Sequence, residues 1–127
     1  MNGHTVRKFR LSDKFISQYE NKKVPWGPVG YVTYKRTYAR RLDERTPGAV
    51  GTEEWFQTCR RVIEGMFNMQ KQHVSHLGLE WNDAKAQKTA KEAYDRLFDL
   101  KWTPPGRGLW MMGTKFVEER TAAGLFN

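Results

Sequence analysis

The sequence predicts a single, mainly α-helical domain, and three observations point to this fold class. Two segments, 55–66 and 86–98, repeat apolar residues at the spacing of one helix face. Prolines and glycines gather between the periodic segments, where they favour turns. The 127 residues suit one domain, and 39% hydrophobic residues with 11 glycines besides are typical of a folded globular chain.

The first two helices are expected before residue 43. Ser12 can cap a short helix. The apolar side of that helix would comprise Phe15, Ile16 and Tyr19. A turn-rich break follows at 25–30. The segment 31–42 is ambiguous, because its tyrosines follow helical spacing while a valine and a threonine favour strand, and we interpret it as a helix followed by a loop at 43–51.

A clearer helix is predicted next. Thr52 is its expected N-cap, with Glu53 and Glu54 in the first turn, where the helix dipole favours negative charge. Its apolar stripe comprises Trp55, Cys59, Val62, Ile63 and Met66. Residues 69–81 form a connector whose structure the pattern does not define.

The last long helix is expected to begin at Asn82, which can serve as its cap. Its apolar stripe comprises Ala86, Ala90, Ala93, Tyr94, Leu97 and Phe98. Pro104 and Pro105 should stop it, since proline disfavours helix in the preceding residue and cannot continue the hydrogen-bond ladder. The tail, 106–127, is rich in glycine and aromatic residues and is interpreted as a loop that leads into a strand.

The net charge of +8 is unevenly placed. Residues 1–51 carry 11 Lys and Arg against 4 Asp and Glu, a net of +7, and residues 52–127 carry 11 against 10, a net of +1. A basic half favours an anionic partner, but it is equally typical of a solvated face or of one that packs on an acidic neighbour. The short apolar runs, the polar start and the single cysteine predict a reducing, cytoplasmic setting with no membrane partner.

Two candidate sites have simple structural interpretations. His73 and His76 have the spacing of a metal-binding pair, but no carboxylate or thiolate at ligand spacing joins them, so two surface histidines are favoured. Cys59 lies within an apolar stripe, and no histidine is positioned by sequence to activate it. We therefore expect a buried hydrophobe rather than a catalytic thiol.

Two further patterns suggest contacts with anions. The run Gly106, Arg107, Gly108 would let backbone amides approach a ligand beside a positive charge, although it matches no phosphate-loop pattern and is also typical of a plain turn. In segment 31–41, tyrosines alternate with lysine and arginine, as in proteins that bind single-stranded nucleic acid. We favour an amphipathic helix with inward tyrosines and solvated cations, and a small basic helical nucleic-acid-binding protein is the alternative function.

Three segments carry a more specific signal when taken together. The first comprises Trp26-Gly27 and the run GYVTYKRTYAR at 30–40. The second comprises Trp55, Thr58 and the run RRVIEG at 60–65. The third comprises Ala93-Tyr94, Leu97, Thr103-Pro104, Gly106-Arg107, Leu109-Trp110 and Gly113-Thr114. Their order and spacing resemble the amino-terminal region of adenosylcobalamin-dependent (class II) ribonucleoside-triphosphate reductases, over nearly the whole chain.

The resemblance implies that residues 12–102 are a helical region and that 103–127 is a loop leading to the first strand of a ten-stranded α/β barrel. In such reductases, the cobalt–carbon bond of adenosylcobalamin breaks, and a barrel cysteine becomes a thiyl radical that takes the 3′ hydrogen of the ribonucleotide. Two further cysteines supply the reducing electrons. None of these three cysteines is expected in this chain, so the segment alone should be inactive. Its partners would be the carboxy-terminal part of the reductase, which holds the cofactor, and the ribonucleotide substrate.

The same resemblance implies three contacts near the substrate. Segment 106–114 would run along the barrel mouth, where Arg107 or the backbone at Gly108 could contact a substrate phosphate. Asn127 matches the asparagine that the family places immediately before the redox-active cysteine of the first strand, although Phe126 replaces a second polar residue that is usual there. A cysteine next in line could also act as a splicing nucleophile, which predicts a split or intein-interrupted reductase.

Overall fold

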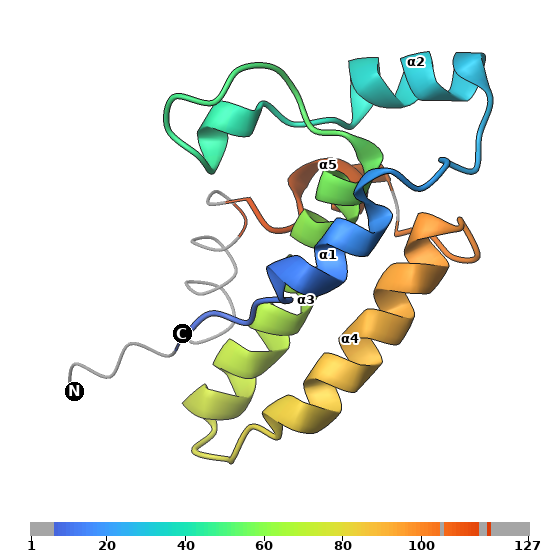
Figure 1. Cartoon of the computed structure of the whole chain (residues 1–127). Coiled ribbons are helices and arrows are strands. Elements are labelled where there is room, and N and C mark those ends of the chain that lie inside the picture. Colours follow the sequence, from blue (N-terminus) through green and yellow to red (C-terminus); the bar gives the residue numbers. More distant parts are fainter. Residues whose placement is uncertain (1–6, 105, 115–116, 118–127) are drawn as a thin grey trace.

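The computed structural model describes residues 7–104, 106–114 and 117, and its regular elements are helices (Figure 1). In chain order they are α1 (Asp13–Glu20), α2 (Pro28–Thr37), the 3₁₀ turn η1 (Leu42–Glu44), α3 (Trp55–His76), α4 (Asp83–Phe98) and α5 (Gly106–Met111). Strand pairing among the described residues is limited to one antiparallel bridge between Arg41 and Thr52. The prediction of a mainly α-helical chain is confirmed.

The two longest helices, α3 and α4, lie side by side and run in opposite directions (Figure 1). Both predicted stripes face the core, and only Met66 and Ala93 among their members are half-buried rather than buried. The buried members are Trp55, Cys59, Val62, Ile63, Ala86, Ala90, Tyr94, Leu97 and Phe98. The indole Nε1 of Trp55 also donates a 3.0 Å hydrogen bond to the carbonyl of Phe98. The helix pair is thus a core of the kind that apolar periodicity predicts.

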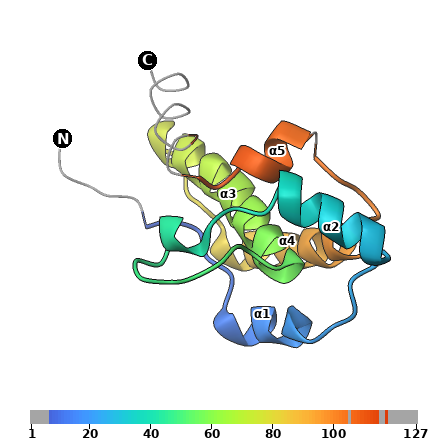
Figure 2. The same cartoon turned by 90° about the horizontal axis from the view of Figure 1, so that it is seen from above.

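Helix α1 packs on one side of α3, opposite α5 (Figure 2). Its predicted cap is confirmed, because the Ser12 hydroxyl accepts a 3.1 Å hydrogen bond from the amide of Phe15. Tyr19 packs against Tyr94 and Phe98 of α4, with ring centroids 4.6 and 5.1 Å away. Aromatic contacts therefore fix this short helix on the α3–α4 pair.

The start of α3 differs from the prediction. Its N-cap is Glu54, not Thr52, and Glu53 precedes the helix instead of lying in its first turn. The Glu54 carboxylate accepts from the backbone of Gln57, whose side-chain oxygen accepts from the Glu54 amide at 2.8 Å. This reciprocal pair satisfies two amides that the helix leaves unbonded. Thr52 instead pairs with Arg41 in the antiparallel bridge.

Both long helices end at a residue of positive φ. Helix α3 continues through most of the predicted connector 69–81, and Gly78 follows it at φ 75°. Helix α4 begins at its predicted cap, Asn82, but it ends before the prolines that were expected to stop it, and Leu100 follows at φ 59°. At each end, backbone amides fold back onto the last carbonyls and complete a local C-cap. These local hydrogen bonds determine where the two helices end, which the amino-acid composition did not predict.

The shorter helices also depart from the predicted boundaries. Helix α2 begins at Pro28, in the first turn where proline is tolerated, and stops well before residue 42. The predicted loop at 43–51 begins within the turn η1. Helix α5 occupies 106–111, where a loop was predicted from the glycines. Glycine is a weak helix former, and here packing against α3 overrides that preference.

Candidate functional site

The segment predicted to meet substrate, 106–114, packs on α3 as helix α5 and the turn after it (Figure 2). Gly108 lies in the first turn of α5 and is half-buried. Arg107 belongs to the same helix, but its side chain lies outside the described part of the chain. Asn127 also lies outside the described residues. What the structure explains is how the segment is held in place.

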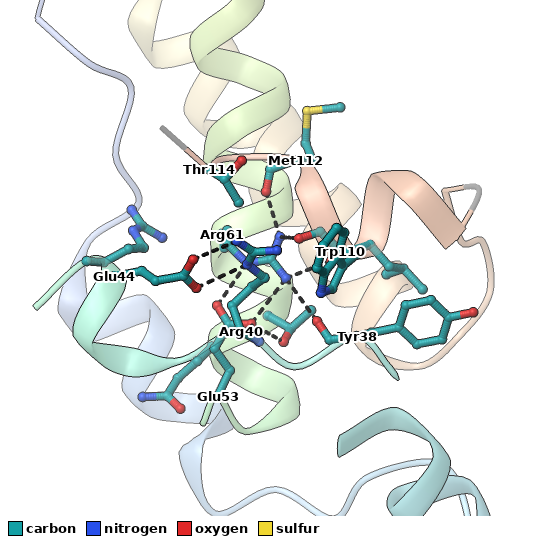
Figure 3. Close-up of polar contacts among 12 residues, drawn as sticks. Tyr38, Arg40, Glu44, Glu53, Arg61, Trp110, Met112 and Thr114 are labelled. Atoms are coloured by element: carbon teal, nitrogen blue, oxygen red, sulfur yellow. Dashed lines mark hydrogen bonds and ion pairs between the residues drawn. The ribbon is translucent and has the colours of Figure 1, made fainter. Parts of the chain in front are cut away.

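A buried arginine on α3, Arg61, is at the centre of this arrangement (Figure 3). Only 1% of its surface is exposed, and its partner Glu53 is 4% exposed. Arg61 Nε lies 2.8 Å from Glu53 Oε2 and Nη2 lies 3.1 Å from Oε1, so the ion pair has two contact points. Buried charges are costly unless they are paired and their remaining polar atoms are hydrogen-bonded. The pair therefore depends on further partners.

Backbone carbonyls supply those partners. Nη1 of Arg61 donates to the carbonyl oxygens of Met112 at 2.7 Å and Trp110 at 3.2 Å. Nη2 donates to Leu109 at 2.6 Å and, more weakly, to Tyr38 at 3.4 Å. Three of these carbonyls belong to α5 and the turn after it, and the fourth follows α2 (Figure 3). One side chain therefore joins three parts of the chain that are far apart in sequence.

The carboxylate of Glu53 is fixed on its other side as well. It accepts hydrogen bonds from the backbone amide of Arg40 at 2.9 Å and from the hydroxyl of Thr58 at 2.8 Å. The Tyr34 hydroxyl contacts Thr58 and donates to the carbonyl of Glu53 at 3.2 Å. Burial raises the pKa of Tyr34, so its hydroxyl stays protonated as a donor at neutral pH. These contacts orient the carboxylate that orients Arg61.

A second contact brings the backbones of α3 and the turn after α5 together. Gly65 lies so close to Gly113 that a Cβ atom on Gly65 would lie 2.5 Å from the Gly113 Cα. Gly113 has φ 80°, and a Cβ there would lie 2.3 Å from the carbonyl oxygen of Arg61. Both positions therefore require glycine, one for the close approach and the other also for its backbone conformation.

The outer rim of the site is formed by Arg40 and Trp110. The guanidinium carbon of Arg40 lies 4.4 Å from the centre of the Trp110 ring, a cation–π contact. The same guanidinium bonds both oxygens of Glu44, at 3.1 and 2.6 Å. A cavity of about 130 Å³ lies beside Arg40 and Arg61, and Thr114 also lines it. Segment 106–114 is therefore held by the buried hydrogen bonds of Arg61 and by the outer contact between Arg40 and Trp110.

The sequence matches a known family over most of its length. Residues 11–114 match the family model of the ribonucleotide reductase alpha domain. This chain belongs to that family. The reductase resemblance of the three sequence segments is thereby confirmed.

Individual reductases give the same result. A protein of Dictyostelium discoideum named probable adenosylcobalamin-dependent ribonucleoside-triphosphate reductase is 41% identical over 124 residues, which are 96% of this chain and 15% of that protein. The Euglena gracilis adenosylcobalamin-dependent ribonucleoside-triphosphate reductase is 35% identical over 125 residues, which are 96% of this chain and 16% of that reductase. A crystal structure of a B12-dependent (class II) ribonucleotide reductase superposes with a TM-score of 0.70 at 34% identity, covering 87% of this chain and 15% of that one. The chain thus spans about 15% of the length of these reductases.

The three reductase-like segments meet at the buried arginine. Tyr38 comes from the first segment, Arg61 and Gly65 come from the second, and two of the carbonyl acceptors, Leu109 and Trp110, come with Gly113 from the third. Sequence reasoning quoted these residues but did not assign them this role. A signal was present, because Arg61 lies among apolar positions of a helix and a charge there needs a partner.

The basic–aromatic pattern at 31–41 serves contacts within the reductase chain. Tyr34 is buried, and the Tyr31 hydroxyl donates a 2.8 Å hydrogen bond to Glu54. The Lys35 ammonium lies 2.8 Å from the carbonyl oxygen of Glu53 and 3.2 Å from the Glu54 carboxylate. The expected inward packing is confirmed for Tyr34, and the family match disfavours the nucleic-acid-binding alternative.

The remaining candidate residues have structural positions. Cys59 is buried, as predicted, and burial raises the pKa of its thiol well above the usual range. His73 and His76 lie near the end of α3. In the described part of the chain, no three His, Cys, Asp or Glu side chains are grouped as metal ligands would be. None of the described helices is long and apolar enough to cross a membrane.

Proposed function

We propose that this chain forms the amino-terminal helical part of a ribonucleotide reductase that converts ribonucleoside triphosphates to deoxyribonucleotides with adenosylcobalamin. The observation that carries the proposal is the family match over residues 11–114, together with 35–41% identity to reductases of that name. Because the chain spans about 15% of those relatives, the activity belongs to the complete enzyme. We expect that enzyme in the cytoplasm, with a ten-stranded barrel following this region.

Adenosylcobalamin does not fit the described residues. The cavities that they line near Arg60 and Arg61 measure about 130, 270 and 350 Å³ and are rich in arginine, and a corrinoid ring is far larger. Cys59 is fully buried in the core, so neither a radical on a cofactor nor a substrate can reach its thiol. We assign the cofactor and the three reacting cysteines to the rest of the reductase, and no chemical step to this chain.

The role that we assign to this chain is to position segment 106–114. Arg61 and the glycine contact hold this segment on α3 before substrate binds, so little ordering is needed on binding. The amide of Gly108 lies in the first turn of α5, where the helix offers it no acceptor, and it can therefore donate to a substrate phosphate. Arg107 would add a positive charge. A contact of Asn127 with the substrate stays a prediction from the family pattern.

A chimeric enzyme tests the function. Residues 1–127 replace the corresponding segment of the Dictyostelium discoideum reductase, which is 41% identical. We expect adenosylcobalamin-dependent reduction of ribonucleoside triphosphates by the chimera and none by the same enzyme without this segment. A chimera that shows the helical content and thermal transition of the parent but no reduction would contradict the proposal.

A pair of variants in the chimera tests the substrate contact. Arg107→Gln should raise the KM for the triphosphate about tenfold and change kcat less, because a charge-assisted hydrogen bond to phosphate contributes to binding. Arg36→Gln, on an exposed part of α2, is the matched control and should leave both constants unchanged. Equal effects of the two substitutions on KM would show that Arg107 does not contact the substrate.

A further inference from the structure

Four arginines line a cavity of about 350 Å³ that adjoins the Arg61 site. Arg10 precedes α1, Arg41 and Arg45 flank η1, and Arg60 lies on α3. They reach the same space from three separate parts of the chain. The other lining residues are Asp13, Leu42, Thr46, Glu53 and Gln57.

Three of these arginines share one carboxylate. Arg60 Nε lies 2.9 Å from the buried Glu64, a terminal nitrogen of Arg45 lies 3.3 Å away, and one of Arg10 lies 3.9 Å away. The backbone amide of Leu11 also donates to Glu64, at 2.8 Å. A single negative charge cannot balance three guanidinium groups, so positive charge is in excess here.

The other carboxylates that line the cavity or pair with its arginines do not remove this excess. Asp13 pairs with Arg60 at 2.9 Å but is 92% exposed, so solvent screens most of its charge. Asp43 pairs with Arg41, and Glu53 is already committed to the buried ion pair with Arg61. Four arginines therefore face three carboxylates, one of them largely in water.

Most of the guanidinium donors remain available to a ligand. A guanidinium carries five N–H donors. Within the described residues, Arg41 and Arg45 each donate one hydrogen bond, to Asp43 and Glu64 respectively. The Arg41 side chain is 73% exposed and that of Arg10 is 59% exposed. The cavity therefore offers forked donors to several acceptor oxygens at once.

We propose that this cavity binds a linear polyphosphate, either inorganic triphosphate or the triphosphate of a nucleotide. Such a ligand carries several charges and many acceptor oxygens, which match forked arginine donors. The volume is at the lower end for small-ligand sites, which suits a compact anion better than a long nucleic-acid strand. The inference concerns binding to this chain and is independent of the proposed reductase function.

Calorimetric titration of the 127-residue chain tests the proposal, with inorganic triphosphate, ATP and a short single-stranded oligonucleotide as probes. We expect saturable one-to-one binding of triphosphate. Equal affinity for ATP would show that the phosphate chain alone is recognised, and tighter ATP binding would show that the nucleoside also contributes; both support the site. Binding of the oligonucleotide alone, or no saturable triphosphate binding, would overturn it.

Matched double variants locate the site. Arg41→Gln with Arg45→Gln should weaken triphosphate binding at least about tenfold, because two charge-assisted contacts are lost. Lys85→Gln with Lys88→Gln makes the same change in net charge on an exposed part of α4 and should change affinity less than about twofold. Equal weakening by both pairs would mean general charge attraction and would reject the site. If circular dichroism shows that the arginine pair disturbs the fold, Arg41→Gln alone should still weaken binding about threefold, and an unchanged affinity would reject the proposal.

Discussion

The two sides of α3 are held by different forces. Where α3 meets α4, buried apolar side chains of both helices, such as Val62 and Leu97, belong to one core. Toward α5, the contact depends on one buried guanidinium, its carboxylate partner and a close approach of two glycines. Burial of apolar surface is non-directional, whereas each hydrogen bond of Arg61 requires a particular acceptor position.

This difference determines how each side responds to change. The α3–α4 contact divides its free energy among many side chains, so a cavity in one place leaves the rest intact. On the α5 side, Leu109 and Met112 also pack on the core, but the polar contacts depend on Arg61 alone. Its loss would leave Glu53 buried without its charge partner and three carbonyls without their donor. The polar side should therefore be the more sensitive to single substitutions.

The largest effect is expected from Arg61→Met. Removing one partner of a buried ion pair costs about 3–5 kcal/mol, because the remaining charge stays desolvated. The free energy of unfolding from urea titration measures the loss. Adding Glu53→Gln to Arg61→Met should recover part of it, since the unpaired charge is then removed.

Arg36→Met is the control for that variant, because Arg36 is exposed on α2. It should change the free energy of unfolding by less than about 0.5 kcal/mol. If Arg61→Met had an equally small effect, the α5 side would not depend on its buried charge, and the comparison would fail.

Leu97→Ala tests the apolar side. Leu97 of α4 is fully buried, so its truncation should cost about 2–5 kcal/mol through lost burial and the cavity left behind. Leu77→Ala, at a position 56% exposed after α3, should cost less than about 0.5 kcal/mol in the same urea titration. Similar costs at the two leucines would show that the α3–α4 pair is not the core.

The apolar side could be predicted from sequence because its pattern repeats. The stripes on α3 and α4 were right in nearly every member, and the caps Ser12 and Asn82 were right because a cap acts within a few residues. The end of α4 was wrong, because Leu100 adopts a positive φ that sequence preference disfavours.

The polar side could not be predicted in the same way, because its contacts join distant residues. Glu53 was expected in the first turn of α3, where the helix dipole favours negative charge. It lies instead just before the helix, where it pairs with Arg61. Helix α5 was expected to be a loop, because its glycines disfavour helix and its contacts with α3 cannot be read from local sequence. The family resemblance included Arg61, Leu109, Trp110 and Gly113 but not Glu53 or Met112, and the structure was needed to show that all of them meet.

Gly113→Ala sharpens the comparison at the glycine contact. The new Cβ would combine an unfavourable positive φ with a 2.3 Å approach to the Arg61 carbonyl, for an expected cost of about 2–4 kcal/mol. Gly51→Ala is a matched control, because Gly51 has φ 94° but open space around its Cβ position. It should cost only about 1–2 kcal/mol from the backbone conformation alone. Equal costs would mean that the close approach to α3 contributes nothing.

The smallest effect is expected from Ser12→Ala, which removes the cap of α1. The hydroxyl of Ser12 accepts from the Phe15 amide, and loss of such a cap costs about 1 kcal/mol. Ser17→Ala, on the exposed part of α1, should change the free energy of unfolding by less than about 0.5 kcal/mol. Because α1 and α5 pack on opposite sides of α3 (Figure 2), Ser12→Ala and Arg61→Met should have additive costs within about 0.5 kcal/mol. A larger coupling would show that the contacts of α3 with α1 and with α5 are not independent.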